Sequence, residues 1–180
     1  MGALCMLRRQ RRAFTLIELV MTMSIIGILA ALSYPRVTQS YYIVKLAGAA
    51  RQVQTQVRYA QQMALNQHAK YDVVFDTANE CYRVADVAAG INVTDPFSRV
   101  AGVSGQDWST GLYVDFVNNK ELGGINISST TSATLRFAST GHPTDTSDVD
   151  LTANFDIVLT YQNNTRTVRV TPYTGVVTVF

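Results

Sequence analysis

The hydrophobic pattern changes character along the chain, and each change predicts a different element. Residues 14–32 form an almost unbroken apolar run, in which Glu18 is the only charged residue. At about 1.5 Å of rise per residue, a helix over these 19 residues would span roughly 28 Å, close to the hydrocarbon thickness of a bilayer. The run therefore predicts a membrane-spanning helix, with a transmembrane part over residues 14–34.

An amphipathic pattern follows the apolar run. From Leu46 onward, small or apolar residues recur in steps of four and three, as expected for one helical stripe that faces a core. The stripe contains Leu46, Ala50, Val53, Val57, Ala60 and Ala64. Pro35 lies between the two patterns and is expected to kink the helix rather than end it, because the helical period resumes beyond it. We therefore predict one long helix over residues 14–66; a short coiled-coil seam is the alternative interpretation of the stripe.

After Lys70 the period becomes the alternation that is typical of strands. Strands are predicted at residues 71–75, 81–84, 111–116, 133–137, 155–161, 165–170 and 176–180. Strands that follow one another with short turns favour an antiparallel, meander-like arrangement. The predicted fold is therefore α+β: a long N-terminal helix, half membrane and half amphipathic, packed on a C-terminal antiparallel β-sheet domain over residues 71–180.

Glu18 is the unusual residue of the apolar run. A carboxylate inside a membrane costs on the order of 2–3 kcal/mol and persists only with a partner or a function. Four arginines between residues 8 and 12 precede the run and are expected to stay with cytoplasmic headgroups. A cut after Ala13 would create a new amine on Phe14, one helical turn from Glu18. Identical helices packed side by side could then neutralise both charges.

These residues resemble a known signal. A short basic leader, a small residue, Phe-Thr-Leu-Ile-Glu and an apolar helix are similar to the class III signal of type IV prepilins and type II secretion pseudopilins. The resemblance implies that residues 1–13 are a leader peptide, that prepilin peptidase cuts between Ala13 and Phe14 and methylates the Phe14 amine, and that Glu18 aligns subunits during assembly. The family normally has Gly before the cut, where this chain has Ala13.

Two other interpretations of the N-terminus are an ordinary secretory signal peptide cut before Tyr34 and an uncut single-span anchor. Neither explains why Phe-Thr-Leu-Ile-Glu follows the arginines.

Several short motifs also resemble the GspH/FimT group of minor pseudopilins and minor type IV pilins. They are the helix segment 57–64, the strand 71–75, the Phe-x-x-x-Gly turn at 137–141 and the Pro-x-Thr-Gly turn at 172–175. Members often have Arg where this chain has Gln61 and Val176. The resemblance implies a structural protein and not an enzyme. Its partners would be other pilin or pseudopilin subunits and the bacterial inner membrane, which it would cross once, with the C-terminal domain in the periplasm or outside.

The charge balance changes when the leader is set aside. The leader holds four of the 15 basic residues and none of the 13 acidic ones, so 11 basic and 13 acidic residues are left, a net charge of about −2. This balance argues against a nucleic-acid partner. An exported DNA-binding minor pilin for DNA uptake is kept as the alternative function, although Arg166 and Arg169 of one predicted strand should point to opposite faces.

No catalytic constellation, cofactor site or metal site is predicted. His68 and His142 lack neighbouring acidic or cysteine residues at a recognisable spacing and are expected at the surface. Cys5 lies in the leader, so Cys81 would have no intrachain disulfide partner and is expected to be a structural thiol. The loop with three acidic residues at 145, 148 and 150 could gather calcium, but it lacks EF-hand spacing, and a solvated loop is expected.

Overall fold

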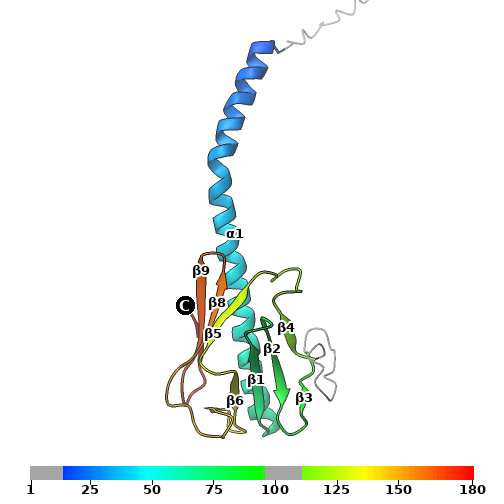
Figure 1. The fold of residues 1–180 in the computed structure, drawn as a ribbon, viewed down its shortest axis with the longest axis vertical. Coiled ribbons are helices and arrows are strands. Elements are labelled where there is room, and N and C mark those ends of the chain that lie inside the picture. The colour runs from blue at the N-terminus through cyan, green and yellow to red at the C-terminus, as the bar shows by residue number, and fades with distance from the viewer. Residues whose placement is uncertain (1–13, 96–110) are drawn as a thin grey trace, which may run out of the picture. The chain divides into compact units, whose positions relative to one another are not determined.

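A computed structural model describes residues 14–95 and 111–180, without the side chains of residues 33–38. The chain divides into two compact units, Met1–Ser40 and Tyr41–Phe180, and helix α1 (Leu16–Gln67) contributes to both (Figure 1). Within the described residues, no helix has both the length and the apolar character of a membrane span. The predicted transmembrane part and the predicted kink at Pro35 both involve side chains outside the described ones.

The strands of the second unit form two sheets in which every pairing is antiparallel. One has the order β3-β2-β1-β6-β7, with β4 also beside β2, and the other has the order β10-β9-β8-β5. The first comprises β1 (Tyr71–Asp76), β2 (Cys81–Asp86), β3 (Ile91–Asn92), β4 (Tyr113–Asp115), β6 (Thr134–Phe137) and β7 (Pro143–Thr144). The second comprises β5 (Asn126–Thr130), β8 (Phe155–Tyr161), β9 (Asn164–Val170) and β10 (Val177–Val179).

The predicted α+β fold, with a long helix on antiparallel sheets, is confirmed, but the single meander is wrong. Among the described strands, β1–β2–β3, β6–β7 and β8–β9–β10 pair in chain order as a meander does, but the remaining pairings do not. Strand β1 also pairs with β6, so that Val73 lies opposite Leu135, and β5 pairs with β8. Strand β5 was not predicted, because its register shifts between Ile127 and Ser129 and this irregularity breaks the alternation of buried and exposed positions.

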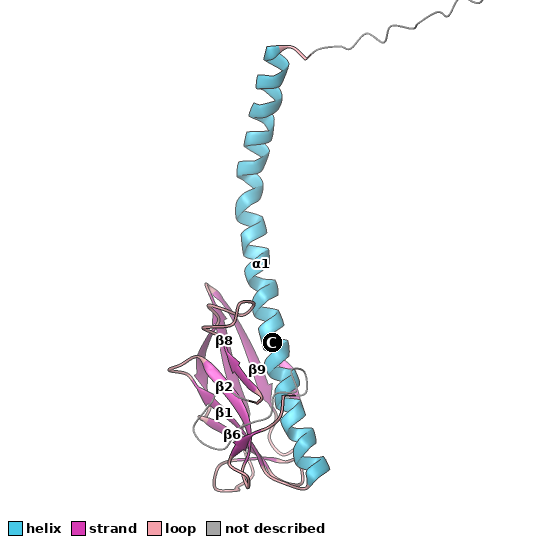
Figure 2. Cartoon of the chain, turned by 90° about the vertical axis from the view of Figure 1, so that its right-hand side faces the viewer, coloured by secondary structure: helices cyan, strands magenta, loops and turns pink. Residues whose placement is uncertain are grey.

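The amphipathic stripe of α1 forms one side of the core, as predicted. All six predicted stripe residues and Ala49 are buried, in one cluster with apolar residues of both sheets. The stripe therefore faces the sheets of its own chain, and the coiled-coil interpretation is wrong. Figure 2 shows α1 lying along the strands of this unit. Four of these seven buried apolar residues are alanines, which allow the helix backbone to approach the strands closely.

One polar contact lies inside this core. Gln56 of α1 is buried, and its side-chain oxygen accepts a hydrogen bond from the hydroxyl of Tyr82 on β2. Burial raises the pKa of Tyr82, so the ring keeps its proton and remains a donor. The pair satisfies both polar groups and fixes the position of the helix against β2.

Candidate functional site

The first turn of α1 contains the residues predicted to act in processing and assembly. The backbone N–H of Glu18 donates to Thr15 Oγ1 at 3.3 Å, and the N–H of Leu19 donates to the Thr15 carbonyl at 3.2 Å. Thr15 is therefore the N-cap of the helix. Glu18 lies in the first turn, where a carboxylate also complements the helix dipole. The sequence prediction missed the capping role, although Thr-x-x-Glu is a readable capping-box signal.

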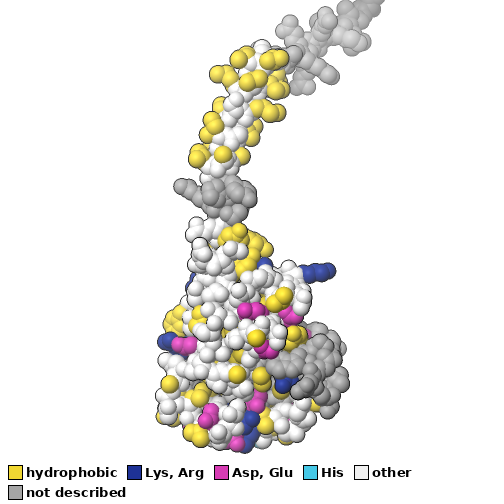
Figure 3. Space-filling model, viewed as in Figure 1, with side chains coloured by type: hydrophobic (Ala, Val, Ile, Leu, Met, Phe, Trp, Pro, Cys, Tyr) yellow, Lys and Arg dark blue, Asp and Glu magenta, His cyan; other side chains and the backbone are white. Residues whose placement is uncertain are grey.

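The apolar stretch that follows is uncovered in this chain. Every side chain from Phe14 to Leu32 is exposed, and hydrophobic side chains lie along the whole stretch (Figure 3). The polar hydroxyls within it bond to the helix itself: Thr22 Oγ1 donates to the Leu19 carbonyl at 2.9 Å, and Ser24 Oγ donates to the Val20 carbonyl at 2.8 Å. A helix that is hydrophobic all round is normally buried in lipid or in protein. We therefore expect lipid or protein, and not water, to cover this surface.

Of the predicted processing and kink residues, Phe14 is described and exposed, and Glu18 is exposed. Ala13 lies outside the described residues, as does the side chain of Pro35. Cleavage between Ala13 and Phe14, methylation of Phe14 and the kink at Pro35 stay predictions.

The side chain of Gln61 attaches both short turn motifs, Phe-x-x-x-Gly and Pro-x-Thr-Gly, to helix α1. Its side-chain Nε2 donates to the carbonyls of Gly141 and Thr174, both at 3.0 Å. These carbonyls come from the Phe-x-x-x-Gly and Pro-x-Thr-Gly turns, so one amide holds both turns to α1. Gly175 has a φ of +67°, and a Cβ at this position would lie 2.4 Å from Gln61 Nε2. The backbone conformation and the close approach of Gln61 thus both favour glycine there.

The next turns of the same helix face hold the C-terminal strand. Gln54 Nε2 and Arg58 Nη2 donate to the carbonyl of Val177, at 2.8 and 2.7 Å. Val177 begins the edge strand β10, and its carbonyl would otherwise lack a partner at that edge. The polar positions beside the buried stripe are therefore a second line of attachment between α1 and the C-terminal segment. Val176 is exposed beside them.

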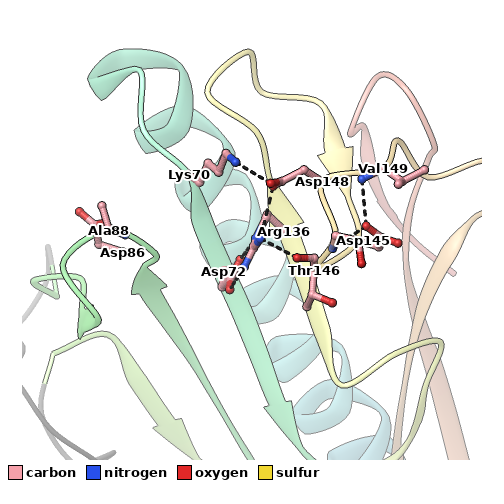
Figure 4. Close-up of polar contacts among 10 residues, drawn as sticks. Lys70, Asp72, Asp86, Ala88, Arg136, Asp145, Thr146, Asp148 and Val149 are labelled. Carbon is pink, nitrogen blue, oxygen red and sulfur yellow. Dashed lines mark hydrogen bonds and ion pairs between the residues drawn. The ribbon is translucent and has the colours of Figure 1, made fainter.

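An ion-pair network holds the acidic loop against the six-stranded sheet (Figure 4). Arg136 of β6 binds Asp72 of β1 through two hydrogen bonds of 2.7 and 3.0 Å. The remaining guanidinium nitrogen of Arg136, Nη1, donates to the Thr146 carbonyl at 2.8 Å and to Asp148 Oδ1 at 3.3 Å. Lys70 also binds Asp148, at 2.6 Å. The hydrogen bonds from Asp72 raise the pKa of Arg136, and those from Lys70 lower the pKa of Asp148.

This network bears on the calcium hypothesis. Asp148 is paired with Lys70 and Arg136, and Asp145 Oδ1 accepts hydrogen bonds from the backbone of Ser147 and Val149 at 2.8 and 2.9 Å. Over the ranges 14–95 and 111–180, no three His, Cys, Asp or Glu residues are grouped so that they could hold a metal ion. The acidic side chains shape the loop through contacts with its own backbone and with the sheet.

The two arginines of β9 do not form a joint basic surface. Val168 and Val170 are buried, so Arg166 shares their face of the strand and Arg169 lies on the other, as predicted. Arg169 is paired with Asp156 of β8 through two hydrogen bonds of 2.7 Å, and its guanidinium lies 5.4 Å from the ring centre of Phe180. The basic cluster that phosphate binding requires is therefore not supplied by these two residues.

The remaining candidates have structural or surface positions. Cys81 is buried and unpaired, and burial raises the pKa of its thiol, so it is a poor nucleophile. His68 and His142 are both exposed, as predicted. His68 follows the end of α1 with a φ of +51°, the conformation that commonly terminates a helix.

A comparison with known protein families identifies the N-terminal segment of the chain. A family model described as the prokaryotic N-terminal methylation motif matches residues 8–34. The chain carries a prepilin-type N-terminus. The resemblance seen in the sequence, to type IV pilins and type II secretion pseudopilins, is thereby confirmed for this segment.

Two solved structures are similar to about three quarters of the chain, each with 10% sequence identity and a TM-score of 0.47. One is the minor pseudopilin EpsH from the type 2 secretion system of Vibrio cholerae; the likeness covers 76% of this chain and 96% of that one. The other is the type IV minor pilin FimU of Pseudomonas aeruginosa, where it covers 75% of this chain and 86% of that one. A search of curated proteins finds no match.

Proposed function

We propose that this prepilin-type chain is a minor pilin or pseudopilin: a structural subunit of a type II secretion pseudopilus or a type IV pilus, and not an enzyme. One observation carries the proposal. The methylation motif at residues 8–34 leads into a helix whose apolar side chains are exposed on all sides. Lipid covers such a surface before assembly, and neighbouring helices cover it in a filament core.

Processing comes first in this proposal. Prepilin peptidase cuts between Ala13 and Phe14 and methylates the new amine of Phe14. The arginines of the leader hold that end of the chain in the cytoplasm until the cut. The chain then crosses the inner membrane once, with residues 71–180 in the periplasm or, after assembly, outside. Other pilin or pseudopilin subunits are the partners of the mature helix.

Glu18 has two candidate roles, which differ in whether they need a charged side chain. The N-cap hydrogen bond uses its backbone N–H and the Thr15 hydroxyl, so it does not require a charged side chain. The assembly role does require charge, because the carboxylate of one subunit would neutralise the Phe14 amine of the next inside an apolar environment. Gln is an accepted capping-box residue at this helix position, and it has no charge. Replacing Glu18 by Gln therefore tests charge alone.

The decisive experiment compares Glu18→Gln with Glu18→Leu in native membranes. We expect both variants to be cleaved normally. Their intact mass should then match a chain that begins at methylated Phe14, and only when the peptidase is present. Both should enter filaments roughly tenfold less than wild type or worse, since an unpaired charge in lipid costs on the order of 2–3 kcal/mol. Normal assembly of Glu18→Gln with failure of Glu18→Leu would show that assembly needs a polar side chain at this position and not its charge, and would refute the charge pairing. Normal assembly of both would refute the pairing, and a start near Tyr34 or at Met1 would refute the pilin pathway.

A further inference from the structure

Strand β4 lies at an open edge of the six-stranded sheet, and among the described strands it pairs with β2 alone (Figure 1). On either side of it, the Leu112 carbonyl and the Phe116 N–H bond to the chain of β2 and its turn, both at 3.0 Å. In an antiparallel ladder, alternate residues turn their main-chain groups to the same side. The main-chain groups of Tyr113 and Asp115 therefore point away from β2, toward the open edge.

The outward groups of this edge are free to bond to another chain. The N–H of Tyr113 donates to the Gly111 carbonyl at 2.9 Å. Within residues 14–95 and 111–180, the Tyr113 carbonyl and both main-chain groups of Asp115 have no hydrogen-bond partner. Unpaired groups at a sheet edge are a template for a further strand.

A recess on the inner side of the edge separates β4 from helix α1. It is a cavity of about 700 Å³. Leu112 and Val114 form an apolar part of its wall, and Arg51 and Thr55 of α1 line it with polar groups. Its other polar lining residues include Gln52, Asp95, Asn118 and Asn119. Arg51 is exposed, and within the described part of the chain its guanidinium has no ion-pair partner. We call this cavity the inner recess.

A second recess, of about 430 Å³, lies on the outer side of the same edge. Asp76, Cys81 and Asp115 are opposite one another across β1, β2 and β4, so both carboxylates lie on one face of the sheet. Hydrogen bonds from Asn79 lower the pKa of Asp76. Burial tends to raise the pKa of Asp115, but hydrogen bonds within its turn lower it overall. This outer recess is therefore negatively charged at neutral pH.

The charge of the outer recess decides which kind of chain fits the edge. A second copy of β4 would bring its own Asp76 and Asp115 to this edge, and like charges opposite one another destabilise a strand pair. A strand with Lys or Arg on its outer face has the complementary charge. The edge is therefore suited to a different polypeptide.

We propose that the open edge of β4 receives an extended segment of a different polypeptide as an added strand of the sheet. The main chain of this segment bonds to Tyr113 and Asp115. Its Lys or Arg side chains face Asp76 and Asp115, and its alternate side chains place carboxylate or amide oxygens beside Arg51. In such strand addition, main-chain hydrogen bonds supply affinity and recesses for alternate side chains supply specificity. The contact is additional to the helix packing of the proposed function, and it uses residues of the second unit alone.

The test measures peptide binding to the full chain in micelles of an uncharged detergent. The probe is a fluorescent peptide of about eight residues, a usual strand length, in which Lys and Glu alternate. The control peptide has the same composition, with all Lys before all Glu. Asp115→Pro removes the outward N–H without removing a bond to β2, whereas Asp115→Asn keeps that N–H and removes the charge. Arg51→Glu reverses the charge of the inner recess, and Arg166→Glu makes the same change on the other sheet. Fluorescence anisotropy gives the affinity, and hydrogen exchange follows the amides of residues 112–118.

We expect wild type to bind the alternating peptide about fivefold more tightly than the control peptide or better, with slower exchange at residues 112–118. Asp115→Pro should weaken binding about tenfold, the effect of a lost main-chain hydrogen bond. Asp115→Asn and Arg51→Glu should each weaken it about threefold, and Arg166→Glu should leave it unchanged.

Equal affinity of wild type for the two peptides would overturn the proposal, because net attraction alone would then explain binding. Equal losses in Asp115→Pro and Asp115→Asn would also overturn it, because the main-chain bond would not be used. If Asp115→Pro does not fold, Arg51→Glu decides, since Arg51 lies exposed on the helix; unchanged binding in that variant would refute the edge as the site. Self-association of the full chain that competes with the peptide would assign the edge to a second copy and overturn the proposal.

Discussion

Replacing Arg136 by Ala should destabilise the folded unit far more than replacing Lys70 by Ala, although both residues bind the same loop. The Arg136 side chain is 13% exposed and that of Asp72 is 16%, whereas Lys70 and Asp148 are each 44% exposed. Arg136→Ala leaves the Asp72 carboxylate without its two hydrogen bonds in a largely buried place. Lys70→Ala leaves Asp148 in water, where solvent replaces the lost partner.

The magnitude follows from this difference in burial. Removing one partner of a fully buried ion pair costs about 3–5 kcal/mol, and hydrogen bonds to charged groups contribute about 1.5–3 kcal/mol. Because Arg136 and Asp72 are each slightly exposed, we expect a loss of about 2–4 kcal/mol for Arg136→Ala. For a unit of this size the melting temperature should fall by roughly 5–15 °C. Lys70→Ala should be nearly indistinguishable from wild type.

Urea denaturation of the fragment 41–180, followed by circular dichroism, measures both variants on one scale. The double variant Asp72→Ala with Arg136→Ala should lose less stability than the two single variants together, because no unpaired charge is left. Equal costs for Arg136→Ala and Lys70→Ala, or strictly additive costs in the double variant, would refute the assignment of the Arg136–Asp72 pair as a largely desolvated contact.

Two further predictions concern the same unit. Gly175→Ala should lower the free energy of unfolding by about 1–2 kcal/mol or more, because it adds left-handed strain and a clash with Gln61. Gly90→Ala is the control, since Gly90 also has a positive φ but open space around a Cβ. Similar urea midpoints for the two variants would exclude a role for the Gln61 contact. Stability should also fall in acid: the hydrogen bonds from Arg169 lower the pKa of Asp156 below its ordinary 3.8, so the stabilisation is present above that value and is lost as the pH falls below it toward the lowered pKa of the folded state. Asp156→Asn should flatten that part of the pH profile, and an unchanged slope would contradict the assignment.

Most of the helix and strand predictions came from local sequence patterns. The stripe from Leu46 to Ala64 and the strands at 155–161 and 164–170 were recognisable because their periods repeat over several residues within one element. Strands β3 and β7 have two residues each and offer no period to read. Strand β5 is polar and irregular, so its pairing with β8 is visible only in the folded chain.

The candidate site also has a part that the sequence predicts and a part that only the folded chain shows. The N-terminal motif is a contiguous sequence, so the resemblance to prepilins could be read from residues 8–34. The cleavage position and the roles proposed for Phe14 and Glu18 are predictions that rest on that resemblance. The attachment of α1 by Gln54, Arg58 and Gln61 could not be read from the sequence. Its acceptors are backbone carbonyls 80 to 123 positions away, and carbonyls carry no residue identity.

By itself, then, the sequence determined the signal at the N-terminus, the single long helix and the alternating strands, because each depends on spacing within one stretch of chain. The tertiary structure alone decided that the strands divide into two sheets and that β1 lies beside β6. It also brought Arg136 to Asp72, and Tyr42 and Lys45 to Tyr161. Such contacts join residues far apart in the chain, and they form only where the common core of helix and sheets brings those residues together.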